Sequence, residues 1–275
     1  MIVKSLENID FKVLIECFLE AFENYYVKMP TDHEYYKKRW KIANVQLGYS
    51  YGMFDQNKLV GFIINAIGDR NGQMIAFNTG TGVIPRYRGK RIVASLYEYA
   101  IPKLKEDGVS LCMLEVIKAN IVAIKAYKQV GFKIIKNYKC YSGTLCIKDS
   151  INNYELKKVT NSYFDWDKLS QDHYSWDNHI ETVKYGDYDY YIVIRDKVTI
   201  GYFVIDADSG YIPQLDVLID VPVNWDCLFS AIESISKTIK INNVDERLAT
   251  KIEYLNRFGL KNTVDQFEME LDLRL

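Results

Sequence analysis

GTGVIPRYRGKRIVA, residues 80–94, is the stretch of sequence that decides the fold of this chain. It predicts the end of a β-strand, a proline-containing turn, a short basic loop and the start of an α-helix. The first backbone N–H groups of a helix have no acceptor within the helix, and together with the helix dipole they attract anions. Gly89 lets the backbone approach a ligand closely. Four basic side chains add attraction for phosphate, namely those of Arg86, Arg88, Lys90 and Arg91.

The sequence on both sides of this stretch alternates between helical and strand patterns. Before it, the pattern predicts two helices and then three antiparallel strands, over residues 8–27, from Thr31, and over 51–54, 59–66 and 74–84. From residue 88 onward, the pattern predicts helix, strand, helix and strand, over residues 88–106, 110–117, 121–130 and 132–141. This order predicts an α+β fold, in which helices flank a mixed, mostly antiparallel sheet.

The second half of the chain repeats this order more faintly. Strands are expected over 154–159, 190–194, 200–205 and 211–219, and helices over 227–240 and 247–258. Gly61-Phe62 corresponds to Gly201-Tyr202 at an offset of 140, and Gly131-Phe132 corresponds to Gly259-Leu260 at an offset of 128. The two offsets indicate a tandem duplication in which the second copy has lost residues. Chance similarity between two α+β halves is the alternative.

The charge is divided unevenly between the two expected domains, residues 1–145 and 146–275. The whole chain has 35 Lys and Arg against 36 Asp and Glu, a net charge of −1. The first domain has 21 basic and 13 acidic residues, and the second has 14 and 23. This favours an anionic ligand in the first half and a cationic one near the second. The near-zero total argues against a protein that coats nucleic acid, because counterion release needs many basic side chains.

Several other classes of protein do not fit the composition. No stretch approaches the 18 apolar residues of a membrane-spanning helix, and the N-terminal MIVKSLENIDFK has no apolar signal core. We therefore expect a cytoplasmic protein that does not bind membranes. Zinc or another metal is not expected, because the chain has three histidines and no Cys-x-x-Cys pair. Reduced thiols are expected for all five cysteines, Cys17, Cys112, Cys140, Cys146 and Cys227.

The basic loop resembles the acetyl-CoA loop of the GNAT N-acetyltransferases. The family's usual form is Gln/Arg-x-x-Gly-x-Gly/Ala, with which Arg86 and Gly89 align, whereas position 91 is Arg instead of Gly or Ala. Backbone amides bind the cofactor in this family, so the resemblance still implies acetyl-CoA as cosubstrate. It implies the following cofactor-binding residues: Val83, Ile84, Arg86, Arg88, Gly89, Lys90, Arg91, Ile92, Val93 and Asn120.

A second stretch resembles the strand and helix that come next in the same family. Leu114-Glu115-Val116 precedes Asn120, Tyr127 and Gly131-Phe132. The resemblance implies that Tyr127 protonates the CoA thiolate, and that Asn120 binds the pantetheine arm or orients Tyr127. It also allows Glu115 to be the general base, with a water chain as the alternative. The purely structural interpretations are a packed tyrosine, a helix N-cap and a solvent-facing carboxylate.

The second domain is expected to be a degenerate copy of the GNAT-like domain. Where the basic loop should recur, residues 220–226 read DVPVNWD, with two acids and no basic residue, so we expect no CoA binding there. Tyr254, the possible counterpart of Tyr127, is expected to be structural. Asp216 and residues 173–176 are candidate contacts to an acceptor, and a solvated acidic surface is the alternative.

The sequence therefore predicts an acetyl-CoA-dependent N-acetyltransferase with tandem GNAT-like domains. In this family a deprotonated amine attacks the thioester directly. The expected acceptor is a small-molecule or peptide amine, and the expected assembly is a monomer or a homodimer without nucleic acid. Two alternatives stay open: a CoA-responsive regulatory protein without turnover, and a transferase of another acyl group.

Overall fold

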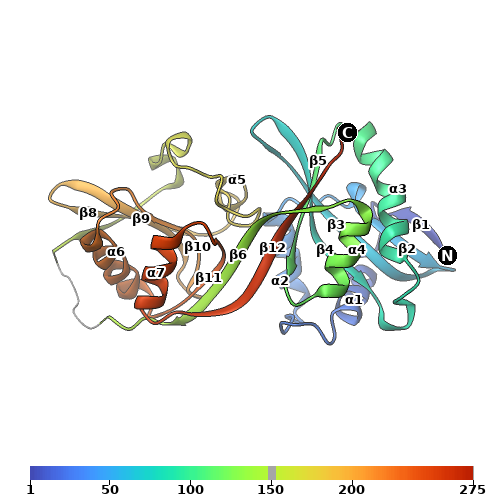
Figure 1. Ribbon diagram of the computed structural model, residues 1–275, viewed down its shortest axis with the longest axis horizontal. Coiled ribbons are helices and arrows are strands. Elements are labelled where there is room, and N and C mark those ends of the chain that lie inside the picture. The colour runs from blue at the N-terminus through green and yellow to red at the C-terminus, as the bar shows by residue number, and fades with distance from the viewer. Residues whose placement is uncertain (148–152, 275) are drawn as a thin grey trace. The chain divides into compact units, whose positions relative to one another are not determined.

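The computed structural model describes residues 1–147 and 153–274, which form two compact units (Figure 1). Unit 1 comprises Met1–Ile135 and Phe267–Leu275, and unit 2 comprises Lys136–Gln266. The unit boundary divides two long strands. Strand β6 (Lys133–Thr144) begins in unit 1 and continues in unit 2, and β12 (Lys261–Asp272) begins in unit 2 and ends in unit 1. The boundary at residues 145 and 146 divides the two sequence repeats and stays a prediction.

Unit 1 is a mixed sheet with helices on both faces. Its strand order is β1-β2-β3-β4-β5-β12, in which β4 and β5 are parallel. The strands are β1 Ile2–Ser5, β2 Tyr51–Asp55, β3 Lys58–Arg70, β4 Gln73–Val83 and β5 Leu111–Ile117. The helices are α1 Phe11–Ala21, α2 His33–Ile42, α3 Ile92–Glu106 and α4 Ile121–Val130.

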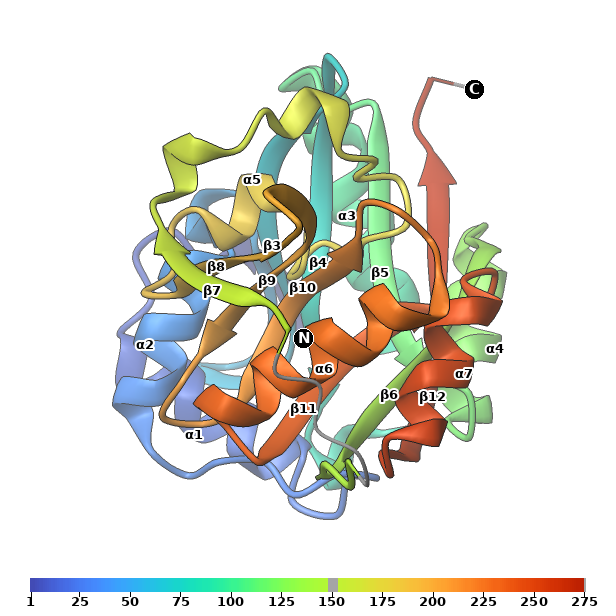
Figure 2. The same cartoon turned by 90° about the vertical axis from the view of Figure 1, so that its left-hand side faces the viewer.

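Unit 2 repeats this plan with fewer residues. Its strand order is β12-β6-β11-β10-β9-β8-β7, in which β10 and β11 are parallel. The strands are β7 Glu155–Val159, β8 Asp189–Arg195, β9 Val198–Asp206, β10 Tyr211–Val217 and β11 Thr238–Asp245. The helices are α5 Ile180–Val183, α6 Pro222–Ile235 and α7 Ala249–Arg257. Figure 2 shows α6 and α7 covering one face of these strands.

Alternation along the strands separates the residues of unit 2 into two packed faces. Phe203 and Ile205 of β9 join the cluster that includes Trp225 of α6 and Leu255 of α7. Val204, which lies between them, packs instead in the cluster that contains Ile180 and Val183 of α5. Both faces of this sheet are therefore covered, which explains the nearly continuous apolar run of β9.

The backbone confirms that the two halves are repeats of one fold. In unit 1, Gly61 pairs with Met53 and Leu59 with Phe54, so Val60 is a bulge. In unit 2, Gly201 pairs with Val193 and Thr199 with Ile194, so Ile200 is a bulge at the same offset of 140. The carbonyl of each bulge residue accepts an equivalent N–H just beyond the next strand, from Ile84 in unit 1 and from Leu218 in unit 2. Chance does not explain an irregularity and its hydrogen bond recurring together.

Most expected elements are present, although several differ in their bounds. The helix expected over residues 88–106 begins only at Ile92, because Arg91 is its N-cap. The first helix is shorter than residues 8–27, because Asp10 caps α1 and Phe22 ends it. Asp32, and not Thr31, is the N-cap of α2. The helix expected over residues 227–240 begins earlier, at Pro222, and ends at Ile235, and residues 238–245 form β11 instead. The sequence pattern also missed β1, β12 and the short helix α5.

No helix in the two described stretches of chain is both long enough and apolar enough to cross a bilayer.

Gly210 provides a test of the unit 2 backbone. Its φ is +68°, and a Cβ atom there would lie 2.1 Å from the carbonyl oxygen of Thr238. We expect Gly210→Ala to lower the free energy of unfolding by about 3 kcal/mol or more, because backbone strain and a backbone clash act together. Urea unfolding followed by tryptophan fluorescence measures this.

The matched control is Gly259→Ala in the same unit. Its φ is +93°, but the nearest atom to an added Cβ is 3.2 Å away. This control should lose only about 1–2 kcal/mol, the usual cost of a left-handed conformation. Equal losses for the two variants would show that the close approach at Gly210 is absent in solution.

Candidate functional site

The candidate site begins where two parallel strands of unit 1 separate. The pairing of β4 with β5 runs from Ile75 and Leu111 to Asn78 and Leu114. Beyond that point β4 continues to Val83 with β3 as its partner, while β5 ends at Ile117 and leads into α4. The separation opens the sheet between the last residues of β4 and the first turns of α4.

A cavity of about 790 Å³ occupies this opening. That volume lies within the range of pockets for drug-sized ligands, roughly 300–1,000 Å³. Its walls come from the end of α1 and the following loop, from the end of β4, from the basic loop with the first turn of α3, and from α4. Of the residues expected to bind the cofactor, the lining includes Val83, Arg88, Gly89, Arg91, Ile92, Val93 and Asn120, and it also includes Tyr127.

The basic loop presents the N-terminus of α3 to the cavity. Gly89 has φ +76°, and an added Cβ would meet no atom within 4 Å. Arg91 is the N-cap with φ 57° and ψ 24°, and its side chain makes no cap hydrogen bond. The first intrahelical bond at this end is from the Ser95 N–H to the Arg91 carbonyl. The preceding amides of the first turn are therefore available to an anion.

Position 91 adopts the conformation that explains the family's preference for a small residue. A left-handed backbone costs an ordinary L-residue about 1–2 kcal/mol, and glycine avoids this cost. Arg91 keeps this backbone geometry despite its side chain. The departure from the usual motif therefore changes the side chain at the cavity wall but not the course of the loop.

The basic side chains of the loop have different roles. The Arg88 guanidinium donates to the carbonyl of Ala21 at 2.9 Å and to that of Val83 at 3.2 Å, so it fastens the loop to α1 and β4. The Lys90 ammonium lies 4.6 Å from the centre of the Tyr87 ring. Lys90 and Arg86 are exposed and do not line the cavity. Arg88 and Arg91 both line the cavity. Arg88 donates to backbone carbonyls, whereas Arg91 makes no such hydrogen bond in the described structure.

Val83 and Ile84 differ in whether they can contact a cofactor in the cavity. Ile84 is fully buried and does not line the cavity. Its N–H donates to Val60 and its carbonyl accepts from Tyr87, so its backbone has no N–H left for a cofactor. Val83 lines the cavity, and its carbonyl accepts from Arg88.

A buried polar cluster lies beside the cavity, and one of its members, Thr81, lines the cavity. Asn78 donates from Nδ2 to the hydroxyls of Thr81 and of Tyr97, the latter at 2.6 Å. Its Oδ1 accepts from the N–H of Gly80 at 2.9 Å, across a bulge at Thr79. This cluster was not predicted from the sequence, although an asparagine inside an apolar strand is itself a signal, because strands disfavour it.

Tyr127 joins this cluster from α4. Its side chain is buried among the rings of Tyr97 and Phe132. Burial raises the pKa of Tyr127 to about 12, although a hydrogen bond with Thr81 lowers it. The phenol is therefore protonated at neutral pH and lies at the wall of the cavity.

Asn120 has two partners. Its side chain accepts from the Ala123 N–H at 3.2 Å and so caps α4. It also forms a hydrogen bond with Tyr25, where burial raises the phenol's pKa and the bond lowers it. Tyr25 and Tyr26, which were not predicted from the sequence, bring the loop after α1 to the cavity, and the Tyr26 hydroxyl donates to the Ala119 carbonyl at 3.1 Å.

Glu115 is not part of the cavity wall. Along β5 the half-buried Glu115 alternates with the buried Leu114 and Val116, so its side chain points to the opposite face of the sheet. Because of the bulge at Thr79, Gly80 of the neighbouring strand β4 lies on the same face as Glu115. A Cβ on Gly80 would meet Phe18 of α1, so α1 covers the face to which Glu115 points. The structure therefore does not bring Glu115 and Tyr127 into one cavity.

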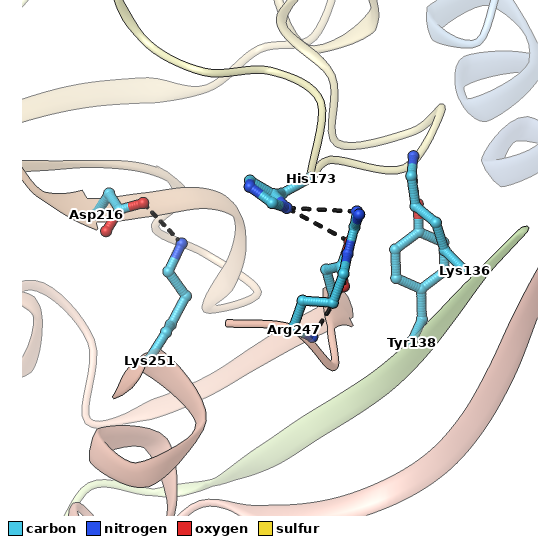
Figure 3. A network of polar contacts seen from close by, with 7 residues as sticks. Lys136, Tyr138, His173, Asp216, Arg247 and Lys251 are labelled. Carbon is cyan, nitrogen blue, oxygen red and sulfur yellow. Dashed lines mark hydrogen bonds and ion pairs between the residues drawn. The ribbon is translucent and has the colours of Figure 1, made fainter. Parts of the chain in front are cut away.

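The equivalent opening in unit 2 is crossed by an ion pair. Val217 pairs with Gly201 as Val83 pairs with Gly61, so Asp216 stands where unit 1 has Gly82. Lys251 of α7 lies at the offset of 128 from Ala123 of α4. Its ammonium lies 3.0 Å from Asp216 Oδ2. Figure 3 marks this ion pair with a dashed line. Gly82 and Ala123 both line the cavity of unit 1, and a salt bridge crosses the same place in unit 2.

The loop before α6 is also closed to an anion. Asp220 accepts from Trp225 Nε1 at 2.7 Å, and Asn224 donates to the Ile219 carbonyl at 2.9 Å. Pro222 removes one N–H from the first turn of α6. Tyr254 stacks on Trp225 with ring centres 5.1 Å apart, a packing role.

The comparisons with known proteins agree with this geometry. The sequence model of the acetyltransferase (GNAT) family matches residues 14–132. No curated protein is significantly similar to the chain.

Solved structures resemble the whole chain, at identities that show the fold alone. An acetyltransferase-like protein from Pyrococcus horikoshii is 16% identical with a TM-score of 0.66, over 98% of this chain and 89% of its own. A GCN5-related N-acetyltransferase from Sphaerobacter thermophilus is 9% identical with a TM-score of 0.69, over 99% and 95%. A tandem GNAT protein from the clavulanic acid biosynthesis pathway is 11% identical with a TM-score of 0.72, over 99% of both chains. The chain thus has the fold of two tandem GNAT domains.

Asn78 provides a test of the polar cluster. We expect Asn78→Ala to lower the free energy of unfolding by about 2–4 kcal/mol, because Thr81, Tyr97 and the Gly80 N–H lose a buried partner. Chemical denaturation followed by circular dichroism measures the loss. Asn57→Ala in the exposed β2–β3 turn is the control and should change stability by less than about 0.5 kcal/mol. A loss at Asn78 no larger than the control's would contradict the described cluster.

Proposed function

We propose that this chain, whose first unit contains a domain of the acetyltransferase (GNAT) family, transfers the acetyl group of acetyl-CoA to an amine. One observation carries the proposal: a single cavity joins an uncapped helix N-terminus to a buried, protonated tyrosine. A polyanionic cosubstrate with a reactive thioester needs both ends of such a cavity. The acceptor is a small-molecule or peptide amine, and the proposed location is the cytoplasm.

The residues of the cavity fit acetyl-CoA. Gly89 leaves open space beside the backbone, and the first amides of α3 together with Arg91 supply donors and charge for phosphate oxygens. The edge of β4 beyond the Asn78–Leu114 pair and the facing turns of α4 form the walls for the pantetheine arm. Arg88 acts indirectly here, because its guanidinium holds the loop against α1 and β4.

Acetyl-CoA supplies the activated acyl group when it is bound. Tyr127 then holds a proton at its Oη, and it donates that proton to the departing sulfur. Thr81 orients this phenol through its hydroxyl, which Asn78 in turn holds in place. Asn120 and Tyr25 close the cavity beside the same helix turn.

The face of the sheet from which the acceptor approaches determines which group deprotonates the amine. Glu115 serves as this base if the acceptor approaches from the face covered by α1, since its side chain is on that side. An acceptor entering from the α3 and α4 side would use a water chain instead. The absence of Glu115 from the cavity is the observation that favours the second candidate, a CoA-responsive binding protein without turnover.

The first test concerns acetyl-CoA binding by the whole chain. We expect saturable binding in calorimetry, and Arg91→Glu should weaken it at least tenfold, because a carboxylate at the cavity wall repels phosphates. Lys103→Glu makes the same change of charge in the last turn of α3 and should leave affinity nearly unchanged. A lack of binding, or equal effects of the two variants, would contradict the proposed cofactor site.

The second test concerns Tyr127. We expect Tyr127→Phe to leave acetyl-CoA affinity within about threefold and to lower kcat about 100-fold or more in a thiol-release assay over an amine panel. Because burial raises the pKa of Tyr127 to about 12, the wild-type rate should show no fall from its deprotonation below pH 10. Tyr99→Phe, on the exposed part of α3, should retain full activity. Unchanged turnover in Tyr127→Phe would rule out its role as the acid, and absence of turnover with every amine would favour the binding protein.

A further inference from the structure

Unit 2 contains a small cavity of its own. It has a volume of about 200 Å³ and lies between β10, α7 and the segment around His173. This is below the roughly 300–1,000 Å³ of pockets for drug-sized ligands, so it suits a ligand of only a few heavy atoms. Asp216 and Lys251 lie in its polar lining together with Lys168, Ser170 and His173, and Tyr174 and Tyr202 provide aromatic surface.

Lys251 is the unusual residue of this wall. Its side chain is only 7% exposed, and lysine is rarely buried to this degree without compensation. An ammonium has three N–H donors, and within the described residues the acceptor that it contacts is Asp216 Oδ2, at 3.0 Å. The Tyr174 ring lies 5.5 Å from the ammonium on another side. A buried cation with donor capacity left over points into a cavity that it lines.

Asp216 is the complementary half of the pair. One carboxylate oxygen accepts from Lys251 and the other from the Val217 N–H at 2.9 Å. Its side chain is nonetheless 38% exposed, so lone pairs remain accessible from the cavity. Figure 3 shows the two side chains reaching toward each other from α7 and from β10. The wall therefore offers a positive and a negative group side by side.

The neighbouring ion pair does not compete for this role. Arg247 binds Asp245 through Nε at 2.9 Å and 3.0 Å, and His173 Nδ1 lies 3.5 Å from the same carboxylate. Burial raises the pKa of Asp245, but the hydrogen bonds and charge of Arg247 outweigh this and keep it below its ordinary value. Asp245 and Arg247 thus hold each other, and neither lines the cavity.

We propose that this cavity binds a free α-amino acid, with its carboxylate at Lys251 and its ammonium at Asp216. The size of the cavity, the adjacent opposite charges and the unused donors of Lys251 match a small zwitterion. The site occupies the same place in the repeat as the Gly82 and Ala123 wall of unit 1. One copy of the duplicated opening thus takes a polyanionic cosubstrate and the other takes an amino acid.

The test uses the full chain and the twenty L-amino acids, each at 10 mM, in a thermal-shift screen followed by calorimetry. At least one amino acid should bind saturably, and acetate and methylamine, each with one of the two charges, should bind at least tenfold more weakly. Lys251→Met should weaken the amino acid at least tenfold, whereas Lys184→Met, a partly exposed lysine of unit 2, should not. Asp216→Asn, which nearly keeps the shape of the side chain, should also weaken amino-acid binding at least tenfold. This second variant keeps the test decisive if Lys251→Met misfolds.

Three results would overturn the inference: no binding of any amino acid, acetate binding as tightly as the amino acid, or amino-acid binding that survives both substitutions. The last result would place the amino acid elsewhere, for example as an acceptor in unit 1. It would leave the proposed transferase function untouched. Conversely, failure of acetyl-CoA binding would not affect this site, because its residues belong to unit 2 alone.

Discussion

The structure depends on the point at which two parallel strands stop pairing. Beyond Asn78 and Leu114 the backbone of β4 loses a neighbour inside the sheet, and buried backbone groups without partners are costly. Asn78 meets this constraint with its side chain, which binds the Gly80 N–H and the hydroxyls of Thr81 and Tyr97. The bulge, the opening and the position of Tyr127 all depend on this one residue and its partners. The basic loop comes next along the chain, so one continuous segment forms both the opening and the exposed N-terminus of α3.

How much the sequence predicts depends on whether the signal is local. The helix predicted over residues 121–130 has the bounds observed, because Asn120 and Gly131 mark its two ends. Strand β11 was missed because residues 227–240 were interpreted as a single helix, and nothing local shows that α6 ends at Ile235. Arg88 was expected to attract phosphate, but a distant carbonyl, that of Ala21, engages it. Contacts between residues far apart in the sequence depend on tertiary structure, and the local sequence pattern does not predict them.

The two repeats show how one opening diverges by substitution at its walls. The backbone irregularities are retained, since the bulges at Val60 and Ile200 accept equivalent hydrogen bonds. The small residues Gly82 and Ala123 leave room in unit 1, whereas Asp216 and Lys251 fill the same positions in unit 2. The charge difference between the halves of the sequence agrees with this pattern, because the basic loop has no counterpart before α6. The two units therefore share one fold but differ in the side chains that line the opening.

The shared strand β12 has a consequence for the order of folding. Met269 and Leu273 belong to the core of unit 1, and the Leu273 N–H donates to the Ser110 carbonyl, yet these residues come after the whole of unit 2 in the chain. Domains usually fold one after another as synthesis proceeds, the first-made domain first. Here the first-made unit cannot complete its sheet until the ribosome has made all of the second. Completion of unit 1 is thereby tied to successful synthesis of unit 2, so a prematurely terminated chain carries an unfinished unit 1.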